Sequence, residues 1–412
     1  MQQEEKVIGH TFFTQKLDQI QKLTQTLHQE EDLLGVLNGK AGIALFQFYH
    51  AKFSNTEASS DVGADIIAQS IESINQGFDY PTFCNGIAGL GWTLDHLYQE
   101  EMIDIDLDEM LSGLDNYLYS SMIGDISQGK FDFLHGALGY GFYFLKRLKN
   151  TQNESLKERY KTYISKLLSI LTHIAVPQEK GVAWKSVLIQ ETNLIGYNLS
   201  LSHGLSSIIY FLARVHDVED FKQTAYPLLQ GSLDYLLSHQ TNQDQEISLF
   251  PSWIAPDVEK NYRSRLAWCY GDLGIALTLL QASESLENPD LSDKAIDIFT
   301  HAAQRRSPET SFVKDASICH GAYGIAKIFN KAYLHTQNPI FKETTDFWML
   351  EATKMAFHED GLAGYSQFFM KDGKESWENK AGLLEGIAGI GLCIIDYLSE
   401  TPHNWDECLM IS

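Results

Sequence analysis

The stretch ICHGAYGIA (residues 318–326) sets a cysteine and a histidine directly before a glycine, and variants of this pattern recur along the chain. In each variant a polar or aromatic residue precedes the glycine, and two residues, a small residue and an apolar run follow it. The variants occupy residues 37–46, 84–92, 134–142, 202–211, 269–277, 319–327 and 384–392, with leading glycines Gly39, Gly86, Gly136, Gly204, Gly271, Gly321 and Gly386. Self-similarity of this kind indicates a repeat architecture.

Each repeat predicts two helices. The glycine-headed segment is apolar on most sides, whereas the stretches between the motifs, such as 156–174, 226–240 and 293–305, carry apolar residues at helical spacing on one face only. Prolines are few and no strand-like alternation recurs. We therefore expect an all-α fold in one domain over residues 1–412, a ring of seven inner and seven outer helices. The glycines would let the inner helices start tightly and pack closely.

The composition restricts the function. The 412 residues carry a net charge of -23, which disfavours a nucleic-acid partner because clustered Lys and Arg are lacking. No basic, apolar leader and no apolar run of about 18 residues is found, so we expect a cytoplasmic protein without a transmembrane segment. Five scattered cysteines do not resemble a disulfide framework and are expected to be reduced.

The position just before each glycine collects polar side chains. These residues are Asn38, Asn85, His135, His203, Tyr270, His320 and Glu385. In a closed ring, equivalent positions of successive repeats converge at one end of the axis. Repeats five and six are neighbours, so Cys269 is expected beside Cys319 and His320.

Two thiolates and one imidazole suit zinc, and they leave the fourth tetrahedral position open, as in catalytic sites. The alternative is equally open at this point: Cys269 and Cys319 as small core residues and His320 as a helix cap. Cys84 holds the same repeat position but lies three repeats from Cys269, and we do not expect it to bind the metal. Cys393 and Cys408 have no ligand partner nearby in the sequence. His135 is expected to line the pore, with a catalytic role as the alternative.

The segments RLAWCYGDLGIA (265–276), ICHGAYGIA (318–326) and LSHGLSS (201–207) together resemble the lanthionine synthetase C-like proteins, the cyclases of lanthipeptide (lantibiotic) biosynthesis. The resemblance extends over nearly the whole chain through the repeats. It implies an α/α toroid and an enzyme that adds peptide cysteine thiols to dehydroalanine or dehydrobutyrine, which gives lanthionine or methyllanthionine thioether rings.

The resemblance also implies roles for individual residues. Cys269, Cys319 and His320 match the ligands of one Zn²⁺ per chain. His203 matches a proposed acid or base, and Asp132 an acidic active-site position that either accepts the thiol proton or orients His203. Arg265 matches a basic residue that either stabilises the enolate oxygen or pairs with Asp132, and Tyr270 matches an aromatic beside the zinc cysteine.

Two departures from the family pattern are visible. Ser207 replaces the second glycine of its repeat, which we expect to affect packing alone, and His135 stands where some relatives have an acid. Two long connections, 177–200 and 240–264, are candidate substrate-contacting loops. In the second, Phe250, Pro251, Trp253 and Ile254 either grip a leader segment or pin the loop to the body of the fold.

Three functions remain in view from the sequence. The first is a zinc-dependent cyclase acting on a precursor peptide already dehydrated by a separate dehydratase, with a transporter as a further partner. The second is addition of glutathione or another small thiol to dehydroamino acids. The third is a zinc-containing scaffold of a peptide-modification complex without catalysis, which the acid-base residues Asp132 and His203 argue against.

Overall fold

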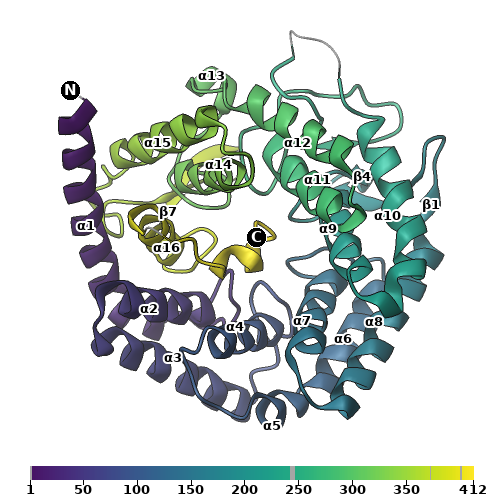
Figure 1. The fold of residues 1–412 in the computed structure, drawn as a ribbon, viewed down its shortest axis with the longest axis horizontal. Coiled ribbons are helices and arrows are strands. Elements are labelled where there is room, and N and C mark those ends of the chain that lie inside the picture. Colours follow the sequence, from purple (N-terminus) through teal and green to yellow (C-terminus); the bar gives the residue numbers. More distant parts are fainter. Residues whose placement is uncertain (1, 242–245, 372, 400) are drawn as a thin grey trace. The chain divides into compact units, whose positions relative to one another are not determined.

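The computed structural model describes residues 2–241, 246–371, 373–399 and 401–412, and helices dominate these ranges (Figure 1). Within them, seven helices begin directly after the glycines of the repeated motif. These are α2 (Lys40–Ser54), α4 (Ile87–Gln99), α7 (Ala137–Asn150), α9 (Leu205–His216), α11 (Asp272–Leu286), α14 (Ala322–Thr336) and α16 (Ile387–Leu398). In α4 every residue from Ile87 to Leu97 is buried. Such helices form the inner layer, as their all-round apolar character predicts.

The amphipathic helices pack outside them. They are α1 (Gln2–Leu27), α3 (Glu57–Asn75), α6 (Asp115–Ser127), α8 (Glu154–Ile174), α10 (Lys222–Leu237), α12 (Pro289–Ala302) and α15 (Pro339–Lys354). The ends of α12 differ from the expected 293–305 because the Asn288 side chain accepts the Asp290 N–H and Pro289 suits a first helical turn. Short helices complete the set: η1 (His28–Glu30), α5 (Leu107–Ser112), η2 (Glu219–Phe221), α13 (Pro308–Ser311) and η3 (Trp405–Leu409).

The chain divides into two compact units. Unit 1 comprises Met1–Asp104 together with Val313–Ser412, and unit 2 comprises Ile105–Phe312. In unit 1, α16 packs against α1, α2 and α14, so the first and last parts of the chain share one core. In unit 2, α9 packs against both α7 and α11, and α8, α10 and α12 cover their outer faces.

The glycines are architectural, as expected. In α2, α4, α7, α14 and α16 the first N–H donates back to a carbonyl six residues before the glycine, for example from Ala137 to Lys130 at 3.0 Å. A Cβ at Gly86 would lie 1.9 Å from the carbonyl oxygen of Tyr80, so no other residue fits. Ser207 is tolerated at the second glycine position, and its hydroxyl donates to the Gly204 carbonyl at 2.7 Å.

Short antiparallel strands occupy the connections, which the helical periodicity did not predict. They are β1 (Val176–Pro177), β2 (Val182–Ala183), β3 (Ser186–Ile189), β4 (Leu194–Asn198), β5 (Trp253–Ile254), β6 (Gln367–Lys371) and β7 (Lys374–Glu378). They pair as β1-β2, β3-β4-β5 and β6-β7. In the last hairpin Phe368 lies opposite Trp377.

The connection 240–264 is pinned to α11 in its described part; residues 242–245 lie outside the described residues. Phe250 is fully buried, and its N–H donates to the Asp272 carboxylate at 3.1 Å. Arg305 holds the same carboxylate at 3.3 Å. Of the two roles expected for this loop, the pinned one agrees with the structure.

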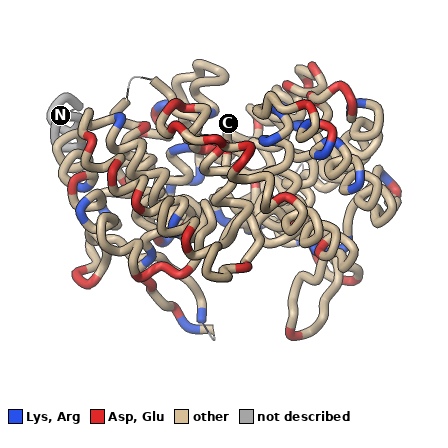
Figure 2. The backbone as a smooth tube through the Cα atoms, turned by 90° about the horizontal axis from the view of Figure 1, so that it is seen from below, with Lys and Arg blue, Asp and Glu red and all other residues tan. Residues whose placement is uncertain are grey.

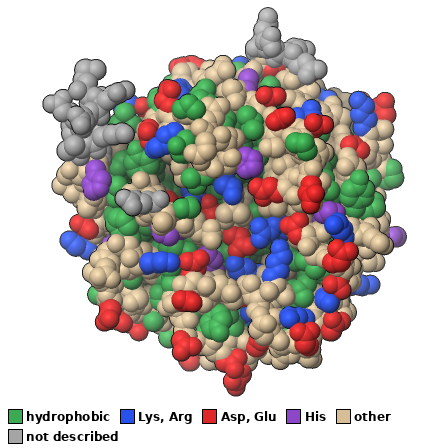
Figure 3. All heavy atoms as spheres, in the orientation of Figure 1, with side chains coloured by type: hydrophobic (Ala, Val, Ile, Leu, Met, Phe, Trp, Pro, Cys, Tyr) green, Lys and Arg blue, Asp and Glu red, His purple; other side chains and the backbone are tan. Residues whose placement is uncertain are grey.

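Charged residues are spread along the chain (Figure 2). On the face drawn in Figure 3, Lys and Arg are interspersed with Asp and Glu. None of the helices within the described residues has the length and apolar character that a membrane span requires.

Candidate metal centre

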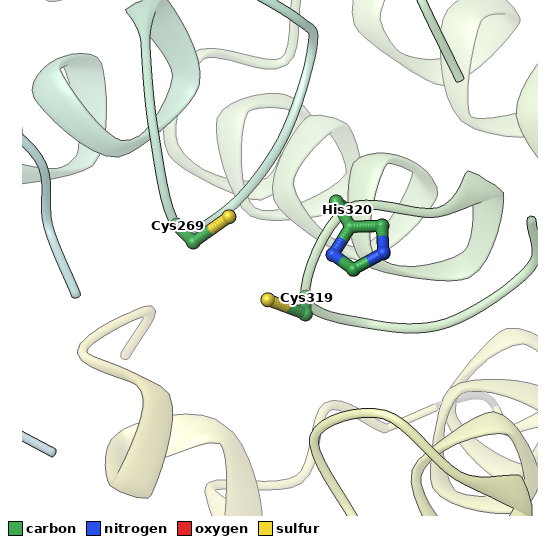
Figure 4. A group of neighbouring side chains, drawn as sticks. All are labelled: Cys269, Cys319 and His320. Carbon is green, nitrogen blue, oxygen red and sulfur yellow. The ribbon is translucent and has the colours of Figure 1, made fainter. Parts of the chain in front are cut away.

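Cys319 and His320 lie in unit 1 on the segment that leads into α14 (Figure 4). The Cys319 N–H donates to the Leu384 carbonyl of the next repeat at 3.0 Å, and Leu384 in turn donates to Leu37 at 2.8 Å. Equivalent positions of neighbouring repeats within this unit therefore lie side by side, as the sequence predicted. The Cys319 sulfur and a ring nitrogen of His320 lie within 4.8 Å of each other.

The His320 ring is held from one side. Its Nε2 lies 3.1 Å from Oδ2 of Asp315 and 3.1 Å from the carbonyl oxygen of Phe368 in β6. The side chain is only 12% exposed. Two neighbours from different parts of unit 1 thus fix the orientation of the imidazole.

Asp315 is completely buried, and each of its carboxylate oxygens accepts hydrogen bonds. Oδ1 accepts from the Ser317 N–H at 2.9 Å and the Ser317 hydroxyl at 2.8 Å, and Oδ2 accepts from the Phe368 N–H at 2.9 Å. Burial alone would raise the pKa of Asp315, but the hydrogen bond and charge of His320 and the backbone N–H donors outweigh it, so the pKa lies below its ordinary value.

Cys269 lies in unit 2 on the segment that leads into α11 (Figure 4). Its carbonyl accepts the Leu201 N–H at 3.1 Å and the Ser202 hydroxyl at 3.3 Å, which fixes its backbone against the preceding repeat. Gly271, two residues on, has φ +87°, a left-handed conformation that favours glycine. The backbone at Cys269 is therefore held in place by hydrogen bonds within unit 2, without a bound ligand.

Asp132 and His203, also in unit 2, lie side by side. Nδ1 of His203 lies 3.5 Å from Oδ2 of Asp132, and Oδ1 accepts the His135 N–H at 2.6 Å. Burial would raise the pKa of Asp132, but the hydrogen bond and charge of His203 and the His135 contacts lower it below its ordinary value. The carboxylate is therefore ionised at neutral pH and faces the imidazole.

Aromatic rings surround His203. The His135 ring stacks on it with centroids 6.1 Å apart, and the Tyr270 ring lies at 6.4 Å. Asn198 Nδ2 donates to the Tyr270 hydroxyl at 3.4 Å. The expected residues Asp132, His203 and Tyr270 are thus brought together in unit 2, with His135 beside them.

Arg265 is half-buried on the segment before Cys269. Asp132 contacts His203 and the His135 N–H within the described part of the chain, and both roles expected for Arg265 stay predictions.

The other cysteines lie apart from this chemistry. Cys84, Cys393 and Cys408 are buried, with exposures of 3%, 2% and 0%, and none belongs to a candidate metal-binding group of the described residues. The sequence did not reveal Asp315 or Phe368, because only the packing of β6 beside the repeat brings Phe368 to a histidine 48 residues earlier.

Comparison with known proteins gives consistent results. The family described as "Lanthionine synthetase C-like protein" matches residues 32–410. A curated relative, "Nisin biosynthesis protein NisC" of Lactococcus lactis subsp. lactis, is 24% identical over 345 residues, which cover 79% of this chain and 76% of that protein.

The solved structure of nisin cyclase superposes with a TM-score of 0.75 at 19% identity and covers 95% of this chain and 96% of that one. A cellobiose 2-epimerase from Bacillus thermoamylovorans gives a TM-score of 0.45 at 13% identity, with 75% and 86% covered. The fold is thus that of nisin cyclase, the expected all-α α/α toroid. Because the family match spans every one of the repeats, this chain belongs to the lanthionine synthetase C-like family.

Proposed function

We propose that this protein is a lanthionine synthetase: a zinc-dependent cyclase that joins cysteine thiols of a dehydrated precursor peptide to its dehydroalanine or dehydrobutyrine residues. The observation that carries the proposal is the family match over residues 32–410. The relatives named as a nisin biosynthesis protein and a nisin cyclase support the reaction class. In this proposal residues 1–412 act as one functional domain.

We further propose that Cys269, Cys319 and His320, drawn in Figure 4, together hold one zinc ion. The donor set fits, because two thiolates and one imidazole bind zinc well and leave a tetrahedral position for a substrate thiol. Zinc bound there would deprotonate the substrate thiol, whose pKa of about 8.5 keeps it mostly protonated at neutral pH.

His203 is proposed as the proton donor. When the sulfur adds to the β-carbon, the C=C bond becomes a C–S bond and an enolate, and the α-carbon must then receive a proton. Asp132 faces Nδ1 of His203, so Nε2 is the nitrogen that delivers this proton and later regains one from solvent. The proton lost by the thiol balances the reaction.

Arg265 and Tyr270 complete the proposed site. A guanidinium near the acceptor would stabilise the enolate oxygen, which is the role proposed here for Arg265 out of the two that the sequence left open. Tyr270, whose hydroxyl accepts from Asn198, is proposed as the aromatic residue beside the zinc-binding cysteine. The dehydrated peptide, a separate dehydratase and a transporter are the proposed partners.

The test compares the full-length chain with Cys269→Ala and Cys319→Ala. The substrate is a synthetic peptide with one cysteine and one dehydroalanine, and loss of free thiol is followed by labelling. We expect about one zinc per wild-type chain, lost in both variants together with the rate above the uncatalysed reaction.

Cys84→Ala is the matched control, because Cys84 has the same motif position but lies outside the proposed ligand set. It should retain zinc and rate. Cyclisation by a metal-free variant would contradict the mechanism. A parallel reaction with glutathione as the thiol separates the cyclase from the small-thiol transferase, and absence of both reactions in a zinc-loaded chain would leave the scaffold.

A further inference from the structure

We propose that Asp315 is a positioning residue for the metal centre: together with Phe368 it keeps the His320 proton on Nε2 and thereby presents Nδ1 as the metal-binding nitrogen. This inference rests on the proposed function, because it concerns a ligand of the proposed zinc ion. It adds a residue that lies six positions before the motif glycine, outside the expected ligand set.

The tautomer follows from what surrounds Nε2. Its two neighbours are an Asp315 carboxylate oxygen and the Phe368 carbonyl oxygen, each 3.1 Å away. A carbonyl oxygen only accepts hydrogen bonds, so Nε2 has to be the donor. In a neutral imidazole the other nitrogen, Nδ1, then carries the lone pair that a metal requires.

Asp315 is itself held in place, so that it can impose this orientation. Ser317 occupies Oδ1 with two donors, and the Phe368 N–H occupies Oδ2. The carboxylate is fully buried and cannot rotate away without losing these bonds. A shift of Asp315 would leave buried donors without partners.

The hairpin β6-β7 completes the arrangement, because Phe368 bonds to both members of the pair. Its N–H donates to Asp315 and its carbonyl accepts from His320. Carboxylate partners of metal-binding histidines commonly fix the ring and raise its basicity in this way. The ring is therefore oriented before a metal arrives, which lowers the cost of assembling the site.

The first test needs no substitution of Asp315. In the metal-free full-length chain with ¹⁵N-labelled histidines, long-range ¹H–¹⁵N spectra report which ring nitrogen carries the proton, and His320→Gln identifies the signal. We expect the proton on Nε2. A proton on Nδ1 would overturn the inference.

The second test measures zinc affinity of the full-length chain by competition with a chromogenic chelator. Asp315→Asn removes one acceptor and places an amide against the Ser317 or Phe368 donors. We expect zinc affinity to fall about 10- to 100-fold, as for comparable partners of metal ligands.

Asp115→Asn in unit 2 is the control. Asp115 is equally buried and accepts from the hydroxyls of Tyr143 and Tyr160, so this substitution also removes a buried carboxylate. It should lower thermal stability with zinc affinity unchanged. If Asp315→Asn bound zinc as tightly as wild type, the inference would be wrong; if it did not fold, the spectra of the first test decide.

The two proposals fail differently. A wild-type chain that binds no zinc, or a Cys319→Ala chain that still binds it, refutes the proposed function. A wild-type chain that binds zinc through Cys319 while Asp315→Asn binds equally well refutes only the role of Asp315.

Discussion

The contact between Asp132 and Nδ1 of His203 leaves Nε2 as the imidazole nitrogen for proton transfer in the proposed reaction. With Nδ1 facing the carboxylate at 3.5 Å, the ring has one remaining nitrogen for proton exchange. His203 is 34% exposed, so a bound peptide can reach it. Of the two roles expected for Asp132, we propose that it orients the ring and stabilises its charged form rather than accepting the thiol proton.

Asp132→Asn tests this assignment. An amide cannot stabilise the imidazolium, so we expect the rate of thioether formation to fall about 10²- to 10⁴-fold while zinc content stays at the wild-type level. Both quantities are measured on the same preparation. Asp234→Asn, a substitution of an exposed aspartate on α10, should change neither. A loss of zinc from Asp132→Asn would instead assign the residue to the metal centre.

Single residues were predictable from the sequence where the motif itself carries them. His320 and His203 directly precede their motif glycines, and Cys319 stands one residue earlier. Because equivalent positions of neighbouring repeats lie close together, the repeat predicted which residues would be near them. Asp315 could not, because its equivalents at the same distance from the glycine include Lys130 and Arg265, and no common residue type marks the position. Its partner Phe368 lies on a hairpin that the repeat does not contain.

At the scale of elements, each repeat contains a turn just before its inner helix. This turn places the two side chains that precede the motif glycine at the amino-terminal end of that helix. In every repeat except that of Ser207 the turn has two glycines, one at the helix start and one where the carbonyl three residues before the first glycine approaches the helix closely. A Cβ at Gly324 would lie 1.9 Å from the Ile318 carbonyl oxygen, next to Cys319. The geometry of the turn therefore controls the position of the proposed ligands.

Gly324→Ala should therefore destabilise the fold. Because backbone atoms have to shift, we expect a loss of about 1–3 kcal/mol in the free energy of unfolding, measured by urea titration, and weaker zinc binding. Gly124→Ala on α6 meets nothing within 4 Å and should be neutral or stabilising by up to about 1 kcal/mol. Equal effects of the two substitutions would contradict the close approach at Gly324.

The helix pairs were predictable from apolar periodicity, and α8 was expected almost to its ends. The strands were not, since β1, β2 and β5 have two residues each and show no alternation. Their existence depends on pairing with segments distant in sequence, as when β4 pairs with β5 through Asn198 and Trp253. Such pairings leave no local pattern.

At the scale of the whole molecule, a cluster of buried charged residues links α14 to the carboxy-terminal elements of unit 1. Lys327 of α14 bonds to Asp396 of α16 and, at 2.8 Å, to Asp406 of η3. Burial would raise the pKa of Asp396, but the charge of Lys327 and hydrogen bonds from His403 and Lys327 hold it below its ordinary 3.8. This contribution to stability is present above the ordinary pKa and is lost as the pH falls through the lowered one.

Lys327→Met should leave two buried carboxylates without their cation. We expect a loss of about 3–5 kcal/mol at neutral pH, measured by urea unfolding, and a smaller difference from wild type in acid, where the carboxylates become protonated. Lys342→Met removes an exposed pair with Asp346 on α15 and should cost less than about 1 kcal/mol. A difference between Lys327→Met and wild type that grew in acid would contradict the assignment.

The division of the chain also sets an order of events during synthesis. Residues 105–312 of unit 2 leave the ribosome as one continuous piece, whereas the face of α2 that packs against α16 stays uncovered until α16 has been made. At about 5–20 residues per second, translation of the intervening segment takes on the order of tens of seconds. During that time α2 exposes apolar surface that chaperones can bind. A ribosome that stalled within unit 2 would leave this surface of α2 uncovered.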